Sequence, residues 1–121
     1  MKRIGVITGG GDCAGLNAVI RGIVVKAASL GIQVYGFRRG FDGLVDGGNF
    51  IRLGTEDVED IMIQGGTILR TSRANPMTHR DGPRQVVNNL AKLGCKALIV
   101  IGGHDVLAFT HQLIKKTGIN V

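Results

Sequence analysis

The chain has 121 residues, no tryptophan, one tyrosine and four phenylalanines, so it can build one compact domain with an aliphatic core. The formal net charge is +6, but the arginines are dispersed and no basic stretch contains interleaved aromatics, which disfavours a nucleic-acid-binding protein. No apolar run approaches the length of a membrane span and no leader pattern precedes the first strand, so we expect a cytoplasmic protein without a membrane partner.

The beginning of the chain is predicted to form two strands with a helix between them. Residues 3–8 are an apolar run typical of a buried parallel strand. A helix is predicted over 15–30, because its apolar residues recur at intervals of three and four. Gly31 suits the position that ends a helix, and 32–37 form the second predicted strand.

The middle of the chain has weaker signals. The segment 38–54 is rich in glycine and aspartate, and we predict a loop with a short hairpin near 44–45 and 50–51. Thr55 is expected to cap a short helix over 56–63. Residues 65–82 are predicted to be mostly loop.

The last third returns to alternating elements, with a helix over 83–93, a strand over 96–101, a helix over 105–117 and the beginning of a strand at 119–121. The order predicts an α/β fold, a doubly wound and mostly parallel sheet with helices on both faces. Because the chain stops at the beginning of a predicted strand, we expect it to be part of a longer protein.

Glycine-rich turns follow two of the predicted strands. Gly9, Gly10, Gly11 and Gly15 lie between the first strand and its helix, and Gly102-Gly103 follow the strand 96–101. Backbone N–H groups without a nearby Cβ approach an anion closely, and a helix N-terminus favours negative charge. Two such turns predict a phosphorylated ligand held between two strand ends.

The glycine pattern leaves alternatives open. It also satisfies a loose dinucleotide-binding pattern, and Arg38-Arg39 at the end of the second strand suit the 2′-phosphate of NADP. A tight strand-to-helix turn without a ligand is the structural alternative. For Asp12, bonding within its own turn is as good an explanation as a catalytic role, and Asn17 either pins the loop or is polar filler.

Other polar residues also have two interpretations. The run 65–73 contains paired glycines, hydroxyls, Arg70 and Arg73, which suits either an anion cradle or an ordinary polar loop. His104 and Asp105 either contact phosphate or a metal, or are simply the first residues of a helix. Cys13 and Cys95 lack metal-type spacing and are expected to be reduced and unpaired.

Together, the runs Thr8–Arg21, Gly65–Leu69 with Ser72-Arg73, and Ile101–Gly103 resemble the amino-terminal part of the phosphofructokinase family over essentially all of residues 1–121. The resemblance implies phosphoryl transfer from ATP or pyrophosphate to the 1-hydroxyl of fructose 6-phosphate with Mg²⁺, and a homo-oligomer, a tetramer or a dimer. It also implies that the catalytic aspartate and most sugar contacts belong to later residues. The 121 residues alone are therefore expected to bind phosphates weakly at best and not to turn over.

The resemblance implies roles for individual residues. Gly10, Gly11, Asp12, Gly102 and Gly103 would form the donor-phosphate site, Phe41 would stand beside a nucleotide, and Arg73 would reach the donor and neutralise transition-state charge.

The chain departs from the family pattern after Gly103. His104 replaces the acid that organises Mg²⁺, and Val106 lacks the usual hydroxyl. Asp105 resembles the pyrophosphate-using branch, because an acid there repels a nucleotide α-phosphate. The departures leave a second hypothesis, a phosphate- or nucleotide-binding module without catalytic activity. The NADP-dependent dehydrogenase is the third.

Overall fold

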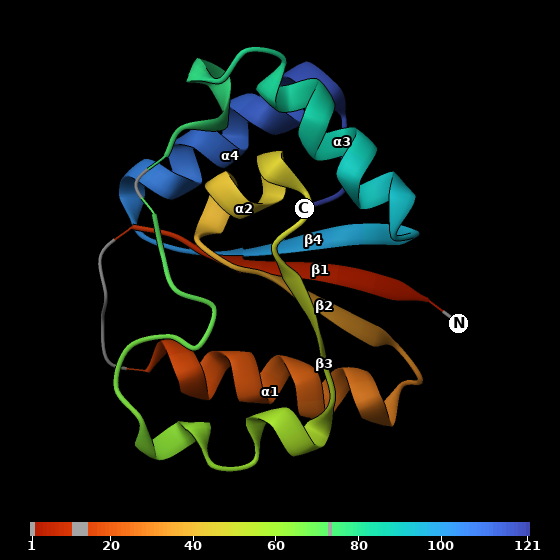
Figure 1. Cartoon of the computed structure of the whole chain (residues 1–121), viewed down its shortest axis with the longest axis vertical. Coiled ribbons are helices and arrows are strands. Elements are labelled where there is room, and N and C mark those ends of the chain that lie inside the picture. The colour runs from red at the N-terminus through yellow and green to blue at the C-terminus, as the bar shows by residue number, and fades with distance from the viewer. Residues whose placement is uncertain (1, 11–14, 73) are drawn as a thin grey trace.

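The computed structural model describes residues 2–10, 15–72 and 74–121. Its sheet contains β1 (Arg3–Thr8), β2 (Gln33–Phe37), β3 (Phe50–Leu53) and β4 (Cys95–Ile101) in the order β3-β2-β1-β4. β1 pairs in parallel with both β2 and β4, whereas β3 is antiparallel to β2 (Figure 1). The predicted α/β class with a mostly parallel sheet is confirmed.

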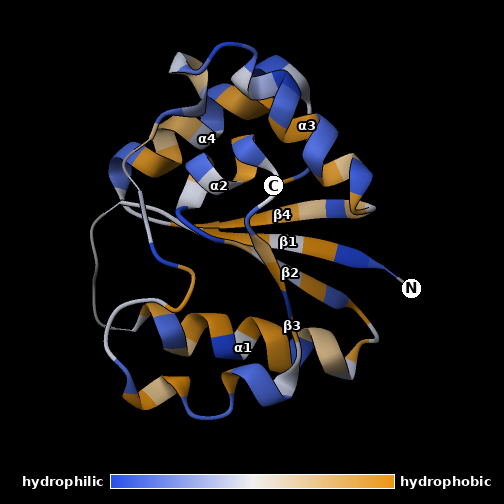
Figure 2. Ribbon diagram, in the orientation of Figure 1, coloured by the Kyte–Doolittle hydropathy of each residue, from blue (hydrophilic) through white to orange (hydrophobic). Residues whose placement is uncertain are grey.

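Helices cover both faces of the sheet. α1 (Leu16–Ser29) lies on one face, and α2 (Gly40–Asp46), α3 (Gly82–Lys92) and α4 (His104–Thr117) lie on the other (Figure 1). Figure 2 shows that β1 and β4 are mainly hydrophobic where they run between these layers. The helices predicted over 15–30, 83–93 and 105–117 are confirmed, and their ends differ from those of α1, α3 and α4 by at most one residue.

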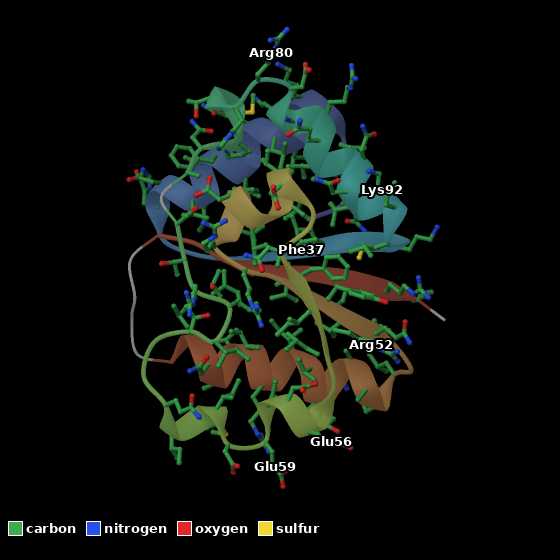
Figure 3. All side chains as sticks on the ribbon, viewed as in Figure 1. Phe37, Arg52, Glu56, Glu59, Arg80 and Lys92 are labelled. Atoms are coloured by element: carbon green, nitrogen blue, oxygen red, sulfur yellow. The ribbon has the colours of Figure 1, made fainter. Side chains whose placement is uncertain are left out.

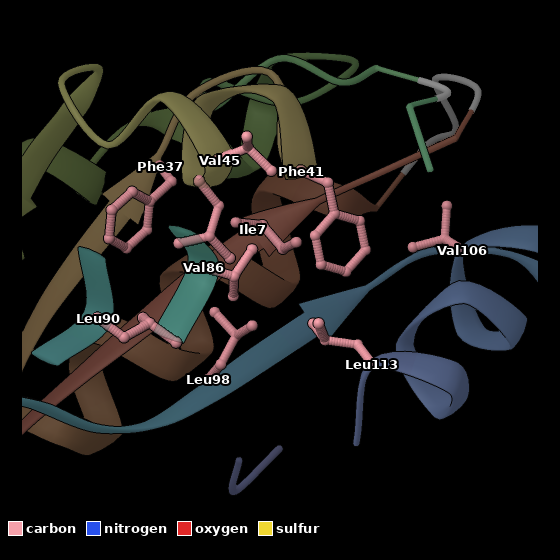
Figure 4. Close-up of a cluster of buried hydrophobic side chains, with 10 residues drawn as sticks. Ile7, Phe37, Phe41, Val45, Val86, Leu90, Leu98, Val106 and Leu113 are labelled. Carbon is pink, nitrogen blue, oxygen red and sulfur yellow. The ribbon is translucent and has the colours of Figure 1, made fainter. Parts of the chain in front are cut away.

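The core consists of two clusters, one on each face, because successive strand residues point to opposite sides. Val6 packs toward α1, and its neighbour Ile7 packs toward the other three helices. Figure 4 shows the second cluster, in which side chains of the helices close over Ile7 and Leu98. The ends of β1 and β4 are therefore held from both sides.

The hairpin predicted within 38–54 is wrong. Residues 40–46 form α2, because Phe41, Leu44 and Val45 lie three and four residues apart and are all buried against the sheet. β3 pairs with β2 instead of with residues 44–45. α2 has only seven residues, two of them glycine. Its apolar periodicity is therefore too short to predict a helix against the low helix propensity of glycine.

The helix predicted over 56–63 is replaced by two 3-10 turns, Thr55–Val58 and Ile61–Ile63. Val58 and Ile61 are buried, but Ile63 is 90% exposed, so no continuous apolar stripe reaches the core. Thr55 does not cap this segment. The carboxylate of Asp57 accepts a hydrogen bond from the Gly54 N–H at 2.7 Å.

The strand predicted at 119–121 is absent from the elements of the described residues, although the Leu98 N–H donates to the Asn120 carbonyl at 2.9 Å. Cys95 is unpaired and half-buried, and burial raises the pKa of its thiol against the opposing effect of Arg3. Cys13 lies outside the described residues. Within the described ranges, no helix has the length and apolar character needed to cross a membrane.

Candidate functional site

The chain reverses its winding direction between β1 and β4. The two strands are adjacent and parallel, yet the chain leaves β1 toward α1 on one face and leaves β4 toward α4 on the other (Figure 1). Both turns therefore open at the same edge of the sheet. In open α/β sheets, ligands bind in the crevice at such a topological switch point.

Three segments meet at this edge. The Gly9 N–H donates to the Ile101 carbonyl at 2.9 Å, and the Gly10 N–H donates to the Ser72 carbonyl at 3.0 Å. A Cβ added to Gly10 would lie 4.0 Å from the Gly103 nitrogen. The structure thus brings Gly10, Gly102 and Gly103 together with the end of the 65–72 loop, and we call this region the switch-point edge.

Two long helices begin at the switch-point edge without side-chain caps from the described residues. Gly15 precedes α1 and Gly103 precedes α4, and neither carries a side chain that could accept from a first-turn N–H. Each helix presents the positive end of its dipole together with first-turn N–H groups. Both features favour an anion at this edge.

Close packing explains why two positions at the edge are glycine. A Cβ on Gly9 would lie 3.0 Å from both methyl carbons of Val106, and one on Gly102 would lie 2.7 Å from the Cβ and Cγ1 atoms of Val106. Val106 is 3% exposed and packs beneath both turns. Val106 therefore fills the core beneath the two turns. The sequence did not predict this packing role and indicated only that a valine lacks the hydroxyl usual in the family.

Thr8 fastens the 65–72 loop to the end of β1. Its side chain is completely buried, and its hydroxyl donates to the Arg70 carbonyl at 2.8 Å and lies 3.0 Å from the Thr67 hydroxyl. The buried hydroxyl is satisfied at both contacts, which makes it a fixed anchor. Thr8 belongs to a run that carries the family resemblance, but the sequence assigned it no role, because a threonine at the end of a strand has no distinctive signal.

Asn17 holds the same loop from α1. Its amide nitrogen donates to the Gln64 carbonyl at 3.2 Å, and its amide oxygen accepts from the Ile68 N–H at 2.7 Å. Asn17 is 2% exposed. The sequence left open whether Asn17 is polar filler or pins the glycine loop that contains Asp12; in the structure it holds the 65–72 loop instead.

The other predicted site residues have different surroundings. His104 and Asp105 are exposed in the first turn of α4, directly beside the switch-point edge. Phe41 is 2% exposed and packs in the core with Ile7 and Val106, which leaves little ring surface for stacking on a nucleotide (Figure 4). Gly11, Asp12 and Arg73 lie outside the described residues.

The described residues do not fit a magnesium site made by the protein. Three or more acidic, histidine or cysteine side chains are nowhere close enough in this part of the chain to hold a metal ion. At the switch-point edge, Asp105 offers one carboxylate and His104 a nitrogen ligand, whereas Mg²⁺ prefers several oxygens.

Comparison with known proteins identifies similar sequences. The family model described as phosphofructokinase matches residues 3–121. The pyrophosphate–fructose 6-phosphate 1-phosphotransferase of Streptomyces coelicolor is 46% identical over 118 residues, which are 97% of this chain and 34% of that protein. The ATP-dependent 6-phosphofructokinase of Thermotoga neapolitana is 42% identical over 121 residues, all of this chain and 38% of that protein.

A solved structure shares the fold. The phosphofructokinase of Pichia pastoris in the T-state superposes with a TM-score of 0.92 at 34% identity, covering 99% of this chain and 13% of that chain. This chain spans 34% and 38% of the length of the two sequence relatives named above.

Proposed function

Since the chain belongs to the phosphofructokinase family, we propose that its switch-point edge binds the phosphates of the donor from which the enzyme phosphorylates the 1-hydroxyl of fructose 6-phosphate. The observation that carries the proposal is that two helix N-termini without side-chain caps and two glycine turns lie at one edge of the sheet. The relatives named for fructose 6-phosphate phosphorylation support the acceptor.

The chain's own contribution is to bind and orient the donor. Gly102 and Gly103 lie at the switch-point edge beside Gly10, and we propose that their backbone N–H groups bind phosphate oxygens, whereas the Gly10 N–H already donates to the Ser72 carbonyl at 3.0 Å. By the family resemblance, Gly11 and Asp12 complete this cradle, and Arg73 neutralises charge that develops during transfer. The base that deprotonates the sugar hydroxyl, and the magnesium, remain expectations of the resemblance.

The donor is proposed to be pyrophosphate. Asp105 is exposed in the first turn of α4, next to the switch-point edge, so its negative charge would repel the α-phosphate of a nucleotide bound there. Pyrophosphate has no such group. Both kinds of donor occur in the names of the relatives, so the donor needs its own test.

A chimera tests the proposal without depending on the length of this chain. The 118 matched residues of the Streptomyces coelicolor enzyme are replaced by the corresponding residues of this chain, and fructose 6-phosphate phosphorylation is measured with each donor. We expect turnover with pyrophosphate. Asp105→Gly is expected to raise the ratio of ATP to pyrophosphate turnover by about tenfold, because it removes a charge repulsion worth on the order of 1.4 kcal/mol.

The chimera also distinguishes the second hypothesis. A folded chimera without turnover, in which His104→Asp restores turnover, would favour a binding module that has lost catalysis. A folded chimera inactive with and without this change would contradict the proposed function. The dehydrogenase hypothesis explains neither the 65–72 loop nor Gly102-Gly103, so it is not carried further.

A further inference from the structure

A polar pocket of about 440 Å³ lies next to the switch-point edge but contains none of its glycines. Its described lining residues are Arg38, Arg39, Asn49, Ile68 and Arg70. They come from the end of β2, the segment before β3 and the 65–72 loop, so three separate parts of the chain build it. The volume falls within the range of small-molecule sites.

Backbone hydrogen bonds fix the three arginines of this pocket. The Arg38 N–H donates to the Asn49 carbonyl at 2.9 Å, and the Arg39 N–H donates to the Leu69 carbonyl at 2.8 Å. The Arg70 carbonyl accepts from the buried Thr8 hydroxyl. The main chain is therefore anchored at each arginine while the side chains remain exposed.

No carboxylate neutralises these guanidinium groups among the described residues. The salt bridge found in this part of the chain joins His79 and Asp42 at 3.3 Å, and none involves an arginine. The described lining residues of the pocket include no acid. Three like charges around one cavity repel one another unless an anion lies between them, and the guanidinium fork matches phosphate oxygens.

Two of the three arginines also have an unfavourable backbone conformation. Arg39 has φ 59° and Arg70 has φ 58°, in the left-handed region that glycine adopts without strain. Asp81 is the other described non-glycine residue in this region, but aspartate tolerates it better. Strained residues that persist together at a pocket point to a functional reason for their side chains.

From these observations we infer that Arg38, Arg39 and Arg70 bind a phosphate-bearing anion in this pocket. The polar lining, the missing counter-charge and the retained strain all support a multiply charged ligand. The site goes beyond the proposed donor cradle and does not depend on it. The phosphate group belongs either to a donor that extends from the switch-point edge or to a separate anion.

The test is an NMR titration of the isotope-labelled chain with pyrophosphate, and separately with inorganic phosphate, at constant ionic strength. Arginine Nε–Hε resonances report the pocket, and glycine amides report the switch-point edge. We expect the resonances of Arg38, Arg39 and Arg70 to shift with saturation. Arg39→Gly and Arg70→Gly are each expected to weaken binding, so that the dissociation constant measured on the remaining pocket arginines rises at least tenfold.

Arg80→Gly is the matched control, since it removes the same charge from an exposed position at the far side of the helical layer (Figure 3). It should leave the dissociation constant unchanged. Without ligand, Arg70→Gly should raise the unfolding midpoint by about 2–5 °C, because glycine relieves the strain, whereas Arg80→Gly should not. Such opposite effects on stability and binding would exclude misfolding as the cause.

The reporters separate the two proposals. Equal dissociation constants at the arginines and the glycine amides would support a donor that reaches the pocket, and different constants would support a separate anion. Shifts of the arginines alone would support the pocket against the donor cradle. The inference is overturned if the arginine resonances stay in place, or if Arg39→Gly and Arg70→Gly bind as tightly as Arg80→Gly.

Discussion

Replacing Gly102 by alanine is expected to lower the free energy of unfolding by about 2 kcal/mol, because the added methyl group overpacks the core. The new Cβ would lie 2.7 Å from the Cβ and Cγ1 of Val106, which is 3% exposed. Val106 is held in α4, so relief requires a shift of the turn or of the helix. Urea unfolding followed by circular dichroism measures the loss.

Gly103→Ala is the matched control for Gly102→Ala. Nothing lies within 4 Å of a Cβ at Gly103, and its φ of −87° suits alanine. Its stability should stay within about 0.5 kcal/mol of the original chain. In the chimera, Gly103→Ala should nevertheless weaken binding of the donor, since the added methyl group enters the proposed donor-phosphate cradle. Equal stability of the two variants would contradict the packing of Val106 beneath the turn.

Asn17→Ala is expected to cost about 3 kcal/mol of unfolding free energy, the larger of the two effects. The substitution leaves the Gln64 carbonyl and the Ile68 N–H without their side-chain partner Asn17, which is 2% exposed, and both lost hydrogen bonds are partly buried. Unsatisfied buried groups cost about 1–3 kcal/mol each. Hydrogen exchange adds a local readout, because the Ile68 amide should exchange faster once its acceptor is gone.

Asn88→Ala provides the control for Asn17→Ala. Asn88 is exposed on α3, so its stability effect should remain within about 0.5 kcal/mol. In the Asn88→Ala variant, the Ile68 amide should exchange at the same rate as in the original chain. If Asn17→Ala and Asn88→Ala proved equally stable with the same Ile68 exchange, Asn17 would not be the anchor of the 65–72 loop.

Long elements with a clear period could be predicted from the sequence. α1 is predictable because Leu16, Ile20 and Val24 mark one buried stripe. β1 and β4 are predictable because both are short apolar runs that precede glycines. The short α2 could not be predicted, since its helical state depends on Phe41, Leu44 and Val45 packing against a sheet formed by distant residues.

The candidate site could be predicted only in part. Glycines after two strands indicate an anion site, because that chemistry is local in the sequence. The pocket of Arg38, Arg39 and Arg70 could not be found in this way, since Arg70 is 31 residues from Arg39 in the sequence. The two come together where the Arg39 N–H donates to the carbonyl of Leu69, the neighbour of Arg70. The packing role of Val106 likewise depends on the juxtaposition of β1 and α4.

The central claim is that the switch-point edge binds phosphate groups. The most direct measurement is the amide ¹H–¹⁵N spectrum of the chain during a titration with pyrophosphate at constant ionic strength. We predict the largest saturable shifts at the amides of Gly10, Gly102 and Gly103. Amides at these three glycines that stay unchanged at millimolar pyrophosphate would contradict the claim.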